Sequence, residues 1–128
     1  MTRKTAISLL FAASALYDGI LGLAFLLAPS PILVWVGTTP PHHLGYVQFP
    51  AALLIVFALM FVQIARDPEG NRTLIPYGIL LKASYCSVVF WYWIAGAMAH
   101  IYKPFAVADL VFMLLFLQAY RLLREQKR

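Results

Sequence analysis

Long apolar stretches alternate with short polar connections along this chain. The apolar stretches cover residues 5–27, 44–65, 74–98 and 104–123. At about 1.5 Å of helical rise per residue, each stretch makes a helix of roughly 30 Å or more, which is the thickness of the hydrocarbon core of a bilayer. The pattern therefore predicts an all-α fold in which four membrane-spanning helices form a single transmembrane domain over residues 1–128.

The connections between these helices are short and rich in turn formers. Residues 29–43 contain several prolines and Trp35, so they are expected to form an interfacial loop with one short helical turn at residues 32–36. Residues 66–72 form a polar turn, and residues 100–103 form the next one. Because short turns make consecutive helices antiparallel neighbours, we expect an up-down-up-down four-helix bundle.

Composition supports an integral membrane protein. The chain is 62% hydrophobic and 12% charged, whereas soluble proteins carry roughly 25% charged residues. The net charge of +5 does not indicate nucleic-acid binding, because the basic residues flank the apolar stretches, where they set orientation. Cys86 is the only cysteine, so one chain can form neither an internal disulfide nor a thiolate metal site.

The basic residues gather on one side of the predicted bundle. Lys103 alone falls on the other side, and Lys82 lies within a helix. The positive-inside rule then places both termini and the middle turn in the cytoplasm. The residues on the cytoplasmic side are Arg3, Lys4, Arg66, Arg72, Arg121, Arg124, Lys127 and Arg128.

The first apolar stretch also has features of a signal peptide. Arg3 and Lys4 precede it, and residues 13–15 read Ala-Ser-Ala, which resembles a cleavage site. However, the apolar character resumes after Asp18 and continues for nine residues, which is too long for a signal core. We therefore expect a retained helix.

Ionisable residues inside the apolar stretches are the candidate chemistry. Asp18 is predicted about 20 Å from the cytoplasmic edge, and Asp109 about 8 Å below the outer edge of a roughly 30 Å core, so they share a layer. Gln48 belongs to the same layer. Lys82 is predicted about 8 to 10 Å from this layer along the membrane normal, a gap that its stem bridges in part. Because such groups are costly in lipid, they are expected to face the bundle interior.

Two interpretations of these polar residues remain open. In the first, Asp18 and Asp109 exchange protons or bind a ligand, and Tyr85 and Tyr92 line an aromatic pocket or donate hydrogen bonds to the aspartates. In the second, Asp18 is an interhelical hydrogen-bond partner, Asp109 occupies a first helical turn, and Lys82 extends to the interface. The second is simpler, because each residue has a separate explanation.

Helical spacing indicates which faces are buried. Ser14, Asp18 and Gly22 recur every four residues and give the first helix a small-residue face suited to close helix packing. Stripes through Lys82 on the third helix and Asp109 on the fourth are expected to meet this face.

Sequence motifs for catalysis or cofactor binding are lacking. His42, His43 and His100 all map to the outer side, but their spacing matches no ligand pattern, and adjacent histidines rarely bind one ion. They are the weak candidates for a metal site, and no metal or cofactor is expected. The chain has no glycine-rich phosphate loop, no nucleophile elbow and no helical His-Glu zinc motif, so nothing argues for an enzyme.

The topology resembles that of small bacterial four-helix membrane proteins of the DoxX-like type, through Gly19 and Gly22, the Pro- and Trp-bearing first outer loop and the cytoplasmic C-terminus. Residues 80–85 (Leu-Leu-Lys-Ala-Ser-Tyr) and 109–112 (Asp-Leu-Val-Phe) are also similar to blocks in bacterial membrane proteins with no assigned activity. The resemblance implies an accessory or assembly role beside a redox or secretion system, and it carries over no functional residue.

The chain is also similar in size to small multidrug exporters, which carry an acidic residue in the first helix, as Asp18 does here. It departs from them in having aspartate for glutamate and charged residues in the third and fourth helices. The sequence therefore predicts an inner-membrane accessory, assembly or interaction protein with a membrane-protein partner or a second copy of itself. The alternative is a small proton-coupled transporter, or a protein that binds an apolar small molecule, that uses Asp18 and Asp109. A lipid-modifying enzyme is a distant third.

Overall fold

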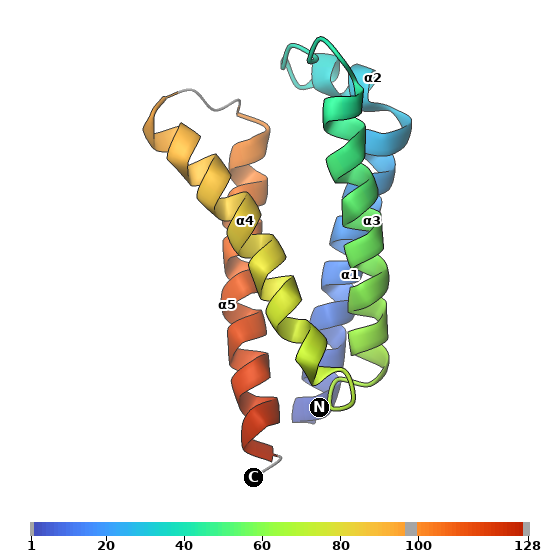
Figure 1. The fold of residues 1–128 in the computed structure, drawn as a ribbon, viewed down its shortest axis with the longest axis vertical. Helices are drawn as coiled ribbons and strands as arrows, with labels where there is room; N and C mark the ends of the chain where they lie inside the picture. The colour runs from blue at the N-terminus through green and yellow to red at the C-terminus, as the bar shows by residue number, and fades with distance from the viewer. Residues whose placement is uncertain (1, 97–99, 127–128) are drawn as a thin grey trace.

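The computed structural model describes residues 2–96 and 100–126, and this part of the chain is all helical, without any strand. Four of its helices are long and apolar enough to cross a bilayer, as the four apolar stretches predicted. In chain order the elements are α1 (Arg3–Leu27), α2 (Pro29–Trp35), α3 (Gly45–Arg66), a short 3-10 helix (Arg72–Leu74), α4 (Ile75–Ile94) and α5 (Tyr102–Gln126) (Figure 1).

Several helix ends differ from the predicted ones, for local reasons. The third spanning helix ends at Ile94 rather than at residue 98, because Gly96 adopts a φ of 78°, the left-handed conformation that commonly follows a helix end. Predicted helical residues 97 and 98 lie outside the described residues, as do Lys127 and Arg128 in the tail. The loop before α3 holds α2, which is longer than the predicted single turn and begins with a proline, as helices often do.

The long helices form two pairs. α1 lies alongside α3, and α4 lies alongside α5 (Figure 1). The two pairs separate toward the end of the molecule that carries α2 and converge at the other end, where both described chain ends lie (Figure 1). Side chains on the outer faces are apolar and exposed, including Leu16, Ile20 and Leu59, which is typical of helices that face lipid.

A cluster of buried apolar side chains joins the two pairs at the converging end. Its aromatic centre consists of Phe11 of α1, Phe61 of α3 and Phe116 of α5. The rings of Phe11 and Phe116 stack with centroids 4.6 Å apart, and Phe61 lies 5.3 Å from Phe116. This cluster therefore contacts both helix pairs and holds them together.

Gly22, at one end of the small-residue face predicted on α1, packs against α3. Gly22 is buried, and a Cβ atom at this position would lie 2.7 Å from the backbone oxygen of Ala51. That oxygen cannot move without moving α3, because it belongs to the helix backbone. The contact therefore sets how closely the two helices approach.

Replacing Gly22 with alanine is expected to lower the free energy of unfolding by about 1 to 2 kcal/mol, because the added methyl group forces α1 and α3 apart. Thermal unfolding in detergent, followed by helical circular dichroism, measures this loss. Gly19→Ala is the matched control, because its nearest neighbour would be the Cβ of Ala58 at an ordinary 3.6 Å. Equal stability of the two variants would contradict the close approach at Gly22.

Candidate functional site

The side chain of Lys82 lies at the centre of the site, fully buried between three helices. Its Nζ donates hydrogen bonds to both carboxylate oxygens of Asp18, each at 2.9 Å, and to Oδ1 of Asp109 at 3.0 Å. We refer to Asp18, Lys82 and Asp109 as the charged triad. The lysine of α4 thereby connects α1 to α5, so the stripes expected to meet do meet.

The triad corrects two expectations. Lys82 does not extend to the interface, because both aspartates lie within reach of its ammonium group in the interior. Its ammonium reaches both carboxylates, so the separation predicted from the helical rise does not keep the three groups apart. Asp109 does not occupy a first helical turn, because α5 begins at Tyr102, two residues before Pro104.

Aromatic rings surround the lysine ammonium. Its Nζ lies 5.3 Å from the ring centre of Tyr17, 5.7 Å from that of Phe61 and 5.2 Å from that of Phe112. These distances are within the roughly 6 Å over which a cation is attracted to an aromatic face. The ammonium therefore has two ionic partners and three aromatic rings close by, which offset the cost of burying it.

The charges of the triad do not cancel. With all three groups ionised, two carboxylates face one ammonium, which leaves a surplus of one negative charge. An uncompensated charge is costly in a low-dielectric interior. A proton on one carboxyl, or a cationic group beside it, neutralises the triad. The arrangement is therefore able to accept one positive charge.

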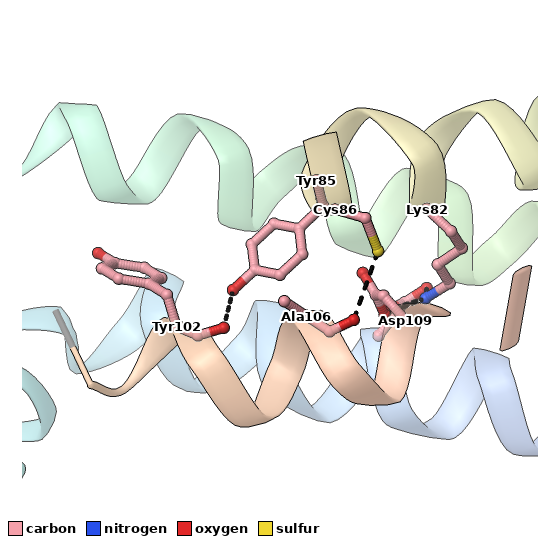
Figure 2. A network of polar contacts seen from close by, with 7 residues as sticks. Lys82, Tyr85, Cys86, Tyr102, Ala106 and Asp109 are labelled. Carbon is pink, nitrogen blue, oxygen red and sulfur yellow. Dashed lines mark hydrogen bonds and ion pairs between the residues drawn. The ribbon is translucent and has the colours of Figure 1, made fainter. Parts of the chain in front are cut away.

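Further polar contacts join α4 to α5 beside the triad. Figure 2 shows Lys82 and Asp109 pointing toward one another between the two helices. The thiol of Cys86 donates to the carbonyl oxygen of Ala106 at 3.4 Å. The hydroxyl of Tyr85 donates to the carbonyl oxygen of Tyr102 at 3.1 Å, rather than to either aspartate as one interpretation expected. Tyr85 is thus held against α5, and its ring faces a cavity.

This cavity has a volume of about 360 Å³ and lies between the two helix pairs, on the side of the triad toward α2. Its lining is mostly apolar and aromatic, and it includes both Asp18 and Asp109, whereas Lys82 does not line it. The side chain of Asp109 is 10% exposed and that of Lys82 is 0% exposed. The floor of the cavity is therefore acidic, with the lysine behind it. Other lining residues include Tyr17, Leu21, Phe25, Val47, Tyr85 and Phe105.

Two other predicted site residues lie apart from the triad. The side-chain amide of Gln48 donates to the carbonyl oxygen of Leu26 at 3.2 Å, so it connects α3 to α1, and the hydrogen bonds described for the two aspartates come from Lys82 alone. Tyr92 is 48% exposed and does not line the cavity. It follows Tyr85 by seven residues, which places it about 10 Å further along α4.

The three histidines are exposed and lie near the helix ends. Nδ1 of His43 accepts a hydrogen bond from the backbone N–H of Gly45 at 3.1 Å, and Nδ1 of His100 lies 3.3 Å from Nζ of Lys103. Within residues 2–96 and 100–126, no three His, Cys, Asp or Glu side chains form a group able to hold a metal ion. His42 is likewise exposed.

Sequence reasoning missed Tyr17 as a site residue. Its ring lies beside the lysine ammonium and lines the cavity, and its buried hydroxyl has no hydrogen-bond partner among the described residues. A usable signal was present, because Tyr17, Leu21 and Phe25 recur every four residues and thus share a helix face. That face now forms one wall of the cavity.

The candidate site thus consists of an apolar cavity and an acidic floor supported from behind by Lys82. It draws on α1, α3, α4 and α5. No protein-family model, curated protein or solved structure matches this chain.

Proposed function

We propose that this protein binds an apolar small molecule from the bilayer in the cavity above the charged triad. The observation that carries the proposal is the cavity of about 360 Å³, apolar on its walls and polar only at a few points, including Asp18 and Asp109. Small-molecule sites typically measure roughly 300 to 1,000 Å³ and combine an apolar lining with few placed polar groups. The cavity fits a small ligand at the lower end of this range.

The proposal includes an up-down-up-down bundle in a bacterial inner membrane, with both termini cytoplasmic. The excess of Lys and Arg near one set of helix ends supports this orientation. So does the position of the described N- and C-terminal residues at the same end of the molecule (Figure 1). In this orientation the cavity lies in the outer half of the membrane, within reach of molecules in the outer leaflet.

The test is to fill the cavity. Val47 of α3 lines it and is half-buried, so Val47→Trp is expected to displace the ligand. The control is Val56→Trp on the same helix, at a position that is 59% exposed and does not line the cavity. Native mass spectrometry of protein extracted gently in its own lipid should detect a small molecule retained by the parent and by Val56→Trp, and lost from Val47→Trp.

The same spectra test a second candidate function, an accessory or assembly subunit of the kind that the DoxX-like resemblance implies. The observation that favours it is that all three hydrogen bonds from the lysine ammonium go to residues of this chain, as expected of a structural connection. A stoichiometric second protein or a second copy beside the 14.4 kDa chain, with no small molecule in any variant, would replace the binding proposal by this one.

Proton-coupled transport is the extension of the binding proposal. A site that accepts one positive charge from either a proton or a ligand provides the exchange that such a cycle needs. It requires in addition that the cavity opens alternately to the two sides of the membrane, which liposome flux measurements address directly.

A further inference from the structure

We infer that the ligand of the cavity carries a cationic ammonium head on an apolar body, and that Asp109 receives this head. The inference rests on the proposed function and specifies its ligand class. Among the three charged groups, only the two carboxylates line the cavity, and the lysine is shielded behind them. An incoming head group therefore meets acceptors that carry negative charge.

The division of the lysine's hydrogen bonds singles out Asp109. Both carboxylate oxygens of Asp18 are bonded to Nζ of Lys82, whereas Asp109 uses Oδ1 alone. Oδ2 of Asp109 accepts no hydrogen bond among the described residues. Asp109 is also the most exposed of the three side chains. It is therefore the carboxylate with an acceptor available to a ligand.

Charge balance favours a cation over other head groups. The triad carries one surplus negative charge when ionised, and one ammonium neutralises it. An anionic head would bring a third negative charge to a low-dielectric site and would be repelled. The aromatic side chains of Tyr17, Tyr85 and Phe105 line the same cavity, and ring faces attract ammonium groups. An apolar body fits the remaining lining, including Leu21 and Phe25.

The experiment compares probes that share one apolar body and differ in the head. Decylammonium, decanol and decanesulfonate are added to the protein in phosphatidylcholine nanodiscs, and bound probe is counted by native mass spectrometry. Binding specific to the cavity is the part that Val47→Trp removes and Val56→Trp retains. We expect decylammonium to bind the parent most tightly and decanesulfonate least tightly.

Asp109→Asn is expected to weaken decylammonium binding by about tenfold or more, the effect of losing a charged hydrogen-bond partner, and to change decanol binding less than about twofold. Asp109→Glu, which keeps the charge, should retain the preference for the cation. Comparing variants probe by probe cancels the different partitioning of the probes into the bilayer. Displacement of decylammonium by added phosphatidylethanolamine would identify a lipid ammonium as the source of the same head group.

The outcomes separate the inference from the proposed function. Cavity-specific binding of decanol with no preference for decylammonium, or an unchanged preference in Asp109→Asn, would overturn the cationic ligand and leave apolar binding standing. If Val47→Trp reduces the binding of none of the three probes, the proposed function itself is overturned. If Asp109→Asn fails to fold, the affinities of the three probes for the cavity of the parent protein test the inference instead. Decanesulfonate binding that equals or exceeds decylammonium binding overturns the inference.

Discussion

Replacing Lys82 with methionine is expected to lower the free energy of unfolding by about 3 to 5 kcal/mol, the usual cost of removing one partner from a buried ionic group. Methionine keeps most of the length and volume of the lysine stem, so the loss reports charge more than packing. Without the ammonium, Asp18 and Asp109 lose every hydrogen bond that they receive from it. Denaturation in mixed micelles, followed by helical circular dichroism, measures the change.

Two further variants identify the origin of this loss. Lys4→Met removes a positive charge from an exposed position on α1 and is expected to change the stability by no more than about 0.5 kcal/mol. A triple variant with Lys82→Met, Asp18→Asn and Asp109→Asn removes all three charges, and it should recover a large part of the stability. No recovery in the triple variant would mean that the lysine acts through packing and not through its charge.

The parts of the fold that follow from hydropathy were predictable. Four apolar stretches of 20 or more residues predict four spanning helices. The structure has four helices that are long and apolar enough to cross a bilayer. The helix ends were less predictable, because they depend on single backbone conformations. Gly96 ends α4 through its positive φ. The sequence does not indicate which glycine inside an apolar stretch adopts this conformation.

The charged triad was partly predictable. The helical rise alone places Asp18 and Asp109 in one layer and Lys82 below it, and the cost of charge in lipid turns all three inward. The rise does not reveal how far a flexible lysine stem reaches, nor that one carboxylate takes two of its hydrogen bonds and the other takes one. Those details depend on how the three helices are rotated about their axes.

One interpretation of the sequence placed Tyr85 in an aromatic pocket, but the position and size of the cavity were not predictable. The cavity exists because the α1–α3 pair and the α4–α5 pair separate toward α2, and this angle is a property of the tertiary packing. The spacing of Tyr17, Leu21 and Phe25 predicts a shared helix face, but neither this spacing nor the position of Phe105 shows that these residues line a cavity. Tyr17 and Phe105 each look like an ordinary core aromatic in their own helix, and only the separation of the pairs turns them into wall residues.

The angle between the pairs depends on the converging end, where Phe61 is the central residue. This fully buried side chain lies 6.1 Å from the ring of Phe11 and 5.3 Å from that of Phe116. In addition, a Cβ at Gly78 of α4 would lie 2.7 Å from the Phe61 ring. Phe61 of α3 therefore contacts α1, α4 and α5, and glycine at position 78 makes room for its ring.

Replacing Phe61 with alanine is expected to lower the free energy of unfolding by about 2 to 3 kcal/mol, from a cavity of roughly 100 Å³ at about 24 cal/mol per Å³. The value is smaller than for a soluble core, because lipid chains are as apolar as the protein interior and transfer from water contributes little. Phe49→Ala is the control on the same helix, at a position that is 68% exposed, and should change stability by no more than about 0.5 kcal/mol.

Phe61→Ala is also expected to reduce ligand retention, although Phe61 does not line the cavity. Loss of its ring loosens the contact from which the two pairs separate and removes one of the three aromatic faces around the ammonium of Lys82. Both effects disturb the positions of Asp18 and Asp109, which form the acidic floor of the cavity. Native mass spectrometry should therefore show less bound ligand in folded Phe61→Ala than in Phe49→Ala. Full retention in a destabilised variant would mean that the cavity keeps its shape independently of the converging end.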